Sequence, residues 1–309
     1  DHQGTTMHQA NARAPRTMSA TDWAQLLLLG ALWGGSFFVA RVAVAEIEPR
    51  TLGVDRGRSS AAALHIWLAA RGISFRPALS HAPSFLVLAA LNNVVPFSLL
   101  FFGQTAIGAG LAAVLNATTP FWTIVAANAL TRDEKITANR LFGIVLGILG
   151  TAVMVGPGVI AGLGAPVWAQ FCAIGASVSY AFATIFARRF SGMRSDVVAT
   201  GQLTASAAIM AVVIGLGASG ITSAGPATWG CVAGLGILST ALAYILYFNL
   251  ITSAGATNTS LVTLVVPVGA ILLGVLFLGE SLDAYELAGM TLIGFGLLTV
   301  DGRVFRVRE

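Results

Sequence analysis

The stretch GAGLAAVLNATTPFWT, residues 108–123, has a counterpart in GATNTSLVTLVVPVGA, residues 255–270, at an offset of 147 positions. Each begins with Gly-Ala and later reaches a proline, Pro120 in the first and Pro267 in the second. An acidic residue and two glycines follow at an offset of 146, namely Glu134, Gly143 and Gly150 against Glu280, Gly289 and Gly296. The chain is therefore an internal duplication, and we expect two structurally similar halves.

Composition places both halves in a membrane. The 309 residues are 56% hydrophobic and 10% charged, whereas soluble domains carry about 25% charged residues. Backbone groups inside a bilayer must bond to one another, which allows only helix bundles and closed barrels. The apolar runs at 138–155 and 261–278 are as long as membrane helices and do not alternate like barrel strands. The sequence therefore predicts an all-α integral membrane protein.

Windows of about 20 apolar residues predict ten transmembrane helices. Their expected spans are 22–42, 54–71, 83–103, 107–130, 138–156, 165–188, 196–218, 227–251, 255–278 and 284–301. Five helices per half is an odd number, so the second half should enter the membrane upside down. We expect two inverted five-helix repeats, 19–157 and 158–302, preceded by a disordered tail or added remnant at 1–18 and followed by a cytoplasmic tail at 303–309.

Charges between the predicted helices indicate the orientation. With a cytoplasmic N-terminus, most of the 17 basic residues fall on the inner side, so the positive-inside rule places both termini in the cytoplasm. The loops that follow the two proline helices carry opposite charge, with Arg132, Lys135 and Arg140 in the first and Glu280, Asp283 and Glu286 in the second. This opposite bias is what an inverted repeat requires.

The first apolar run has two interpretations. As a membrane helix, it would be capped by Ser19 or Thr21, with Asp22 near its positive end. As a cleaved signal peptide, it would end at the small residues Ala43-Val44-Ala45. The run exceeds the usual length of a signal sequence, which favours the helix.

Three features together resemble a known family: Leu32-Trp33-Gly34-Gly35-Ser36-Phe37 in the first helix, the two proline helices, and the turn Gly279-Glu280-Ser281-Leu282. From about residue 20 to 302, the chain resembles the EamA-type branch of the drug/metabolite transporter superfamily, and within it the YddG-like aromatic amino-acid exporters. The resemblance implies a five-plus-five inverted plan. It also implies a secondary transporter that moves metabolites such as amino acids, often outward.

One segment departs from the family pattern. Residues 53–60 hold Asp55, Arg56 and Arg58 where an apolar second helix is expected. Charges are costly at the bilayer centre, so these should lie at the interface or face water. We expect the second helix to be short or irregular there.

Transport needs a polar site near the middle of the membrane, commonly where helices are interrupted and the repeats meet. Prolines free backbone carbonyls there, and aromatic rings can stack on an apolar or aromatic cargo. These criteria select Trp33, Ser36, Asn92, Asn93, Pro96, Asn116, Thr119, Pro120, Trp122, Tyr180, Tyr244, Asn258, Thr263 and Pro267 as cavity candidates. The alternative for each is ordinary packing or hydrogen bonding between helices. For Trp33 and Tyr180 the cavity interpretation is favoured further, because the two residues occupy equivalent positions of the repeat.

Ionisable groups are scarce in the predicted helices. Asp22, Asp196 and Asp301 map to helix ends, so the chain lacks the embedded carboxylate with which proton-coupled drug exporters exchange protons for cations. His65 lies deep in an apolar run and is a candidate for proton handling, with hydrogen bonding between helices as the alternative. A zwitterion can be held by helix dipoles and freed backbone groups, which favours a neutral or zwitterionic cargo.

These observations favour a secondary transporter in the inner (plasma) membrane that exports amino acids or similar solutes by alternating access. A passive channel or facilitator is the alternative, and an enzyme is disfavoured because no helix carries a catalytic motif. The expected partners are a small-molecule substrate and the lipid bilayer. The net charge of +4 is spread over short loops, which argues against nucleic acid. The sequence is compatible with a monomer and leaves the oligomeric state open.

The two cysteines offer no metal site or disulfide. Cys172 and Cys231 both lie in apolar runs without a partner motif. We therefore expect them to be reduced, and we expect neither a metal nor a cofactor.

Overall fold

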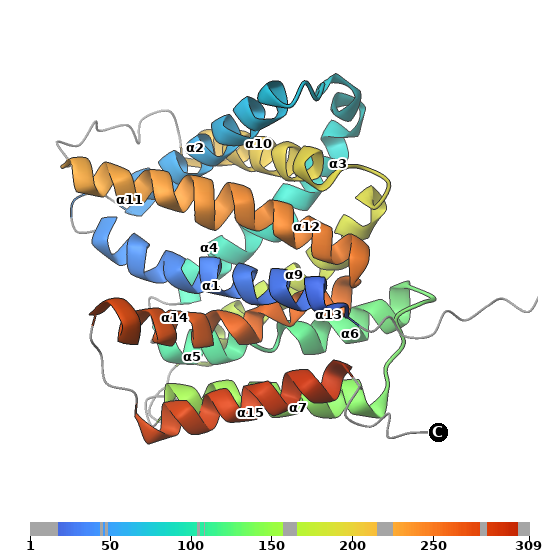
Figure 1. Cartoon of the computed structure of the whole chain (residues 1–309), viewed down its shortest axis with the longest axis vertical. Coiled ribbons are helices and arrows are strands. Elements are labelled where there is room, and N and C mark those ends of the chain that lie inside the picture. The colour runs from blue at the N-terminus through green and yellow to red at the C-terminus, as the bar shows by residue number, and fades with distance from the viewer. Residues whose placement is uncertain are drawn as a thin grey trace, which may run out of the picture.

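The computed structural model describes residues 18–43, 46, 49–103, 106–107, 109–156, 166–214, 225–278 and 283–301. These residues form helices and connecting turns and contain no strand, as predicted for an all-α chain. Most of the helices run in similar directions, side by side (Figure 1). Residues 1–17 of the expected N-terminal tail, the turn at 279–282 and the tail from residue 303 lie outside the described residues, whereas Met18, the last residue of the expected tail, is buried.

Several helical stretches suit a membrane. Five of those described are long and apolar enough to cross a bilayer: Arg76–Leu100, Ala138–Val155, Val167–Phe190, Pro226–Ser253 and Ala256–Leu273. Large apolar side chains also lie on the outer surface, including Val212 at 83% exposed and Leu276 at 73%. Such a surface is compatible with lipid contact rather than with water.

Helix α1, Ala20–Ala43, begins at a capping box. The backbone N–H of Asp22 donates to Ser19 Oγ at 3.1 Å, and the backbone N–H of Ser19 donates to the Asp22 carboxylate at 2.9 Å. Ser19 is thus the cap, and two otherwise unpaired backbone donors are satisfied. Ser253 Oγ also donates to Asp22, which ties the start of α1 to the end of α12, Ala243–Ser253.

Helix α2, Pro49–Ala70, runs without interruption through the charged segment. The expectation of a short or irregular helix at 53–60 is therefore wrong. Helical geometry separates the charges, because successive side chains point about 100° apart. Arg58 is exposed, whereas Arg56 is half-buried and bonds to Thr240 within the bundle.

The third predicted helix and its counterpart in the second half each contain a π-helical turn. The segments of the first are η1 Arg76–His81, α3 Ala82–Ala89, the π-helical η2 Ala90–Val94 and α4 Val95–Gly103. Those of the second are α11 Pro226–Gly236, the π-helical η4 Ile237–Leu242 and α12. The two π-helical turns start 147 positions apart, at the offset of the duplication. Each lies in the interior of its span, and π-helical turns are frequent at functional sites.

The two proline segments have different backbone shapes. They form α5 Ala109–Asn116 with α6 Thr119–Leu130, and α13 Ala256–Ser260 with α14 Val262–Leu278. In the first segment the helix breaks before Pro120, which lies in the first turn of α6. In the second it breaks at Leu261, and α14 continues through Pro267.

Helices α7, Ala138–Val155, and α15, Ala284–Asp301, pack closely at one end of the molecule (Figure 1). A Cβ atom on Gly143 would lie 2.5 Å from the carbonyl oxygen of Gly296, and one on Gly296 would lie 2.6 Å from that of Gly143. Gly150 and Gly289 face each other in the same reciprocal way. Gly143 therefore contacts the repeat counterpart of Gly150, and Gly150 contacts the repeat counterpart of Gly143. This is the pattern of a contact with two-fold symmetry.

Helices also approach each other closely at glycines elsewhere in the bundle. A Cβ atom on Gly34 of α1 would lie 2.6 Å from the backbone nitrogen of Ala270 in α14. One on Gly147 of α7 would lie 2.6 Å from Leu264. Small residues at these positions let neighbouring backbones touch.

The remaining described helices complete the bundle: α9 Val167–Ala187, η3 Arg188–Phe190 and α10 Ser195–Ile214. Helix α9 contacts α4, α5 and α6 of the first half, and α10 packs along α2. The two halves therefore interleave, and a site between them is built from both.

Candidate functional site

Four buried side chains form a hydrogen-bonded group, the polar centre, defined as Asn92, Asn93, Gln202 and Tyr244. Asn93 Nδ2 donates to the Tyr244 hydroxyl at 3.1 Å, and Gln202 Nε2 donates to Asn93 Oδ1 at 2.6 Å. Asn92 Nδ2 donates to Gln202 Oε1 at 3.3 Å. Both asparagines come from the π-helical η2, whereas Gln202 and Tyr244 come from the second half.

Arg56 borders the polar centre. Its Nε donates to Thr240 Oγ1 at 2.7 Å, and its Nη2 lies 3.5 Å from the carbonyl oxygen of Ser239. Both partners belong to the π-helical η4. Tyr180 and Tyr244 are near enough to interact electrostatically with the guanidinium. A permanent charge therefore stands beside neutral polar groups in the middle of the bundle.

Aromatic rings lie against this polar region. The ring centroid of Trp33 is 5.9 Å from that of Tyr244 and 5.8 Å from that of Tyr247. The Tyr247 hydroxyl is hydrogen-bonded to Thr184 Oγ1 at 2.8 Å. Such edge and tilted contacts are favourable for aromatic pairs. Trp33 itself is half-buried.

The structure brings together only some of the predicted site residues. Trp33, Asn92, Asn93 and Tyr244 lie at or against the polar centre, and Tyr180 approaches it through Arg56. Several others bond to backbone carbonyls of their own segment: Ser36 to Trp33, Thr119 to Asn116, Asn258 to Ala254 and Thr263 to Ser260. These hydrogen bonds are local, and the place of these residues in a solute cavity stays a prediction.

The first proline segment holds a second group of predicted residues. Trp122 Nε1 donates to Thr118 Oγ1 at 3.1 Å, within the first turn of α6 and its N-cap. Asn116 Oδ1, at the end of α5, is buried and meets no hydrogen-bond donor among the described residues. Pro96 and Pro120 are buried and Pro267 is half-buried. The break thus leaves an acceptor that a moving helix or a solute can use.

His65 lies on the outside of the bundle. Its side chain is exposed, its Nε2 is 3.0 Å from Thr204 Oγ1 of α10, and its ring meets Phe75 edge-on at 5.1 Å. These contacts are those of a histidine that links two helices. The proton-handling role stays a prediction.

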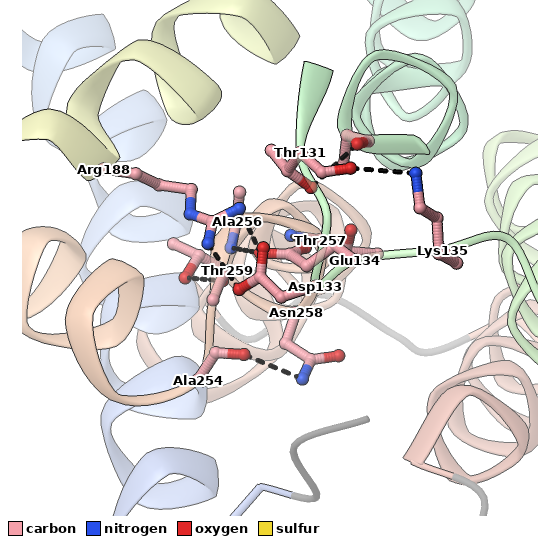
Figure 2. Close-up of polar contacts among 12 residues, drawn as sticks. Thr131, Asp133, Glu134, Lys135, Arg188, Ala254, Ala256, Thr257, Asn258 and Thr259 are labelled. Atoms are coloured by element: carbon pink, nitrogen blue, oxygen red, sulfur yellow. Dashed lines mark hydrogen bonds and ion pairs between the residues drawn. The ribbon is translucent and has the colours of Figure 1, made fainter. Parts of the chain in front are cut away.

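A second contact between the halves is made by Glu134, in the loop after α6 (Figure 2). The backbone N–H groups of Ala256 and Thr257 donate to its two carboxylate oxygens, each at 2.8 Å. Arg188 Nη1 lies 3.4 Å from Glu134 Oε1, and Arg188 also pairs with Asp133. The carboxylate thereby caps the first turn of α13, where backbone donors and the helix dipole favour negative charge.

The loop around Glu134 is held in place by its neighbours. Lys135 Nζ donates to the carbonyl oxygens of Asn128 and Thr131 at 2.7 and 2.9 Å, which caps the end of α6 (Figure 2). Gly255 has a φ of +88°, and a Cβ atom there would lie 2.7 Å from Glu134 Oε1. Only glycine allows this approach without strain.

A pocket of about 640 Å³ opens beside the Glu134 contact. Its lining includes Arg132, Arg140, Arg188 and Arg189, together with Asp133 and Glu134. The excess of arginine makes the pocket basic, so it attracts anions toward this end of the molecule.

Sequence reasoning missed Arg56 and Gln202. The charge on Arg56 suggested a membrane interface, because the sequence does not show that it faces a π-helical turn. Gln202 could have been found from the sequence, because it is a polar amide in the interior of the apolar stretch at 196–218. A polar side chain at that depth must find a partner, and Asn93 is the partner.

Comparisons with known proteins agree with this architecture. A model of the EamA-like transporter family matches the chain twice, over residues 22–156 and 167–300. The uncharacterized inner membrane transporter YedA of Escherichia coli is 25% identical over 89% of both chains. A probable terminal-alkyne amino-acid exporter of Streptantibioticus cattleyicolor is 24% identical over 94% of this chain and 97% of its own. A solved crystal structure shares the fold with a TM-score of 0.77 at 18% identity, over 94% of this chain and all of the other.

Proposed function

The chain belongs to the EamA-like transporter family, and we propose that it is a secondary transporter that exports amino acids or similar neutral or zwitterionic solutes. A membrane transporter contacts lipid and a small-molecule substrate. We further propose ten transmembrane segments in two inverted five-helix halves, with both termini in the cytoplasm. The inner-membrane name of the relative from Escherichia coli supports the same location here.

The polar centre carries this proposal. Asn92 and Asn93 belong to the first family match, whereas Gln202 and Tyr244 belong to the second, so one hydrogen-bonded group joins both copies. Polar side chains are expensive inside a membrane and commonly mark the path of a solute. A substrate site at the interface of two repeats, near mid-membrane, is the arrangement used by repeat-built carriers.

The Glu134 contact supports alternating access. It joins a loop of the first copy to the start of α13 in the second, beyond the polar centre, and would close one side of a solute path. Hydrogen bonds and one ion pair can break and reform as the halves rock. In the duplication, Glu280 and Arg41 stand at the positions equivalent to Glu134 and Arg188, so the same residue types are available for the opposite side.

The choice of amino acids rests on two observations. One relative is named as a probable exporter of an amino acid. Trp33, Tyr244 and Tyr247 also form a cluster of aromatic rings, the aromatic wall, against which an apolar or aromatic side chain can pack.

Counterflow tests the proposal. The purified full chain is reconstituted into liposomes preloaded with one unlabelled amino acid, and uptake of the same labelled amino acid is followed across a panel of the twenty. We expect saturable uptake that is accelerated by internal substrate. Unsaturable flux that ignores internal substrate would instead indicate a channel. Uptake of organic cations without any amino acid would refute the choice of cargo.

A further inference from the structure

Arg56 is a cation in the interior of the bundle. It bonds to Thr240 and Ser239, which lie in the middle of the helical stretch Pro226–Ser253. Its side chain is half-buried, and the two bonds hold the guanidinium against the π-helical turn.

No carboxylate among the described residues pairs with this guanidinium. The ion pairs found there involve Arg188 and Arg194. Its electrostatic neighbours are the hydroxyl groups of Tyr180 and Tyr244. Asp55 is adjacent in sequence, and adjacent side chains on a helix do not face each other. Arginine cannot release its proton, so a buried guanidinium calls for an anionic or strongly polar partner.

The duplication shows that the helix contact itself does not require a cation. Gln202 of α10 donates to Asn93 in η2, just as Arg56 of α2 donates to Thr240 in η4. Asn93 and Thr240 are 147 positions apart, and Arg56 and Gln202 are 146 apart, so the two contacts are counterparts. The second half builds its version with a neutral amide. The contact between the two helices therefore does not need the positive charge of Arg56.

We propose that Arg56 binds the carboxylate group of the cargo, an inference that rests on the proposed transport function. Arginine carries five N–H donors, and the two bonds to η4 use only part of them. The planar fork matches a carboxylate in two-point contact. Tyr244 interacts with Arg56, accepts a hydrogen bond from Asn93 and contacts the Trp33 ring, so it links this site to the polar centre and to the aromatic rings. The cargo is an amino acid whose carboxylate sits at Arg56.

The test compares an acid with its amide. Each of the twenty L-amino acids is added to the purified full chain in detergent, and the one that raises the melting temperature most is taken as the best ligand. The amide of that amino acid is the matched probe. We expect the wild-type chain to bind the acid at least about tenfold more tightly than the amide, as loss of one charge-assisted contact implies. This comparison needs no variant and so does not depend on a mutant folding.

Variants locate the effect. Arg56→Gln should lower affinity for the acid about tenfold and leave affinity for the amide unchanged, while Arg56→Lys should retain part of the preference. Arg58→Gln is the control, because it removes the same charge from an exposed position on the same helix. Equal binding of acid and amide by the wild type, or an equal loss of both in Arg56→Gln, overturns the proposal.

Binding and counterflow separate the two proposals. Carboxylate-dependent binding without counterflow would refute transport and leave the Arg56 site standing. Counterflow of acid and amide at equal rates would refute the Arg56 site and leave transport standing. Failure of every amino acid to bind refutes the Arg56 site.

Discussion

Asn93 and Thr240, 147 positions apart, accept equivalent hydrogen bonds: Gln202 Nε2 donates to one and Arg56 Nε donates to the other. Each acceptor lies in a π-helical turn, and each donor comes from the second helix of its half. The polar middle of the bundle is thus built twice from the same geometry with different chemistry.

Asn93→Ala should weaken both folding and transport. It removes the acceptor of Gln202 Nε2 and the Asn93 donor to the Tyr244 hydroxyl, and an unmet buried polar group costs about 1–3 kcal/mol. We expect a lower melting temperature in detergent and slower counterflow. Ser98→Ala, at an exposed position of α4, is the control and should change neither. Normal counterflow by a folded Asn93→Ala protein would count against the polar centre as the solute site.

Glu134→Gln should loosen the Glu134 contact. The amide keeps one acceptor oxygen but loses the other and the ion pair with Arg188. A reporter cysteine replaces the buried Ser260 of α13 in a chain without Cys172 and Cys231. We expect it to react faster with a membrane-impermeant thiol reagent when Glu134 is changed. Arg132→Gln, an exposed change in the same loop, is the control. Unchanged labelling in Glu134→Gln would contradict a closing role.

Gly255→Ala should be more damaging than an ordinary glycine substitution. Its φ of +88° disfavours any side chain, by roughly 1–2 kcal/mol, and the new Cβ atom would collide with Glu134. Gly72 has a φ of +64° with nothing near its Cβ position, so Gly72→Ala measures the backbone cost alone. The difference between their melting temperatures reports the Glu134 contact. Equal losses would show that Glu134 moves aside freely.

Gly143→Ala should separate α7 from α15. The added methyl group would sit 2.5 Å from the Gly296 carbonyl oxygen, and overpacking of this kind costs about 1–3 kcal/mol. Gly294→Ala in α15 is the matched control, since nothing lies within 4 Å of its Cβ position. That change should be neutral or stabilising by up to about 1 kcal/mol through helix propensity. The melting temperatures of Gly143→Ala and Gly294→Ala are compared. Equal melting temperatures would refute the close contact between α7 and α15.

His65→Gln should leave the pH dependence of counterflow unchanged. The histidine is exposed and bonds to Thr204, so the expected loss is one hydrogen bond between helices, about 0.6 kcal/mol. Thr204→Val removes the same bond and should have the same small effect on melting temperature. A pH profile altered by His65→Gln but not by Thr204→Val would instead support proton handling.

The sequence predicted the helical membrane architecture, and it did so because apolar length and glycine spacing act locally. Helices do approach closely at Gly143 and Gly34. Asn92, Asn93, Trp33 and Tyr244, selected from the sequence as cavity candidates, lie at or against the polar centre, and their contact with a cargo stays a prediction.

Arg56 and the π-helical turns could not be predicted in this way. A π-helical turn changes which residues share a helix face, and nothing in the composition of residues 90–94 or 237–242 marks it. Without that turn, no partner for Arg56 could be named, and the charge was assigned to the membrane surface. Ser36 and Thr263 were selected in the same way, but their hydroxyl groups donate to nearby backbone carbonyls, those of Trp33 in α1 and Ser260 at the end of α13.

The two proline segments share one sequence pattern but hold two backbone shapes, with the break next to Pro120 in one and at Leu261 in the other. Each shape is a concrete example of what its counterpart can adopt. Exchanging the shapes between the proposed inverted halves would yield a conformer related to this one by the two-fold axis of the repeat, with the opposite side open. We expect the helix break to shift along each proline segment, toward the proline in one half and away from it in the other. This shift would change the side of the membrane to which the solute path opens.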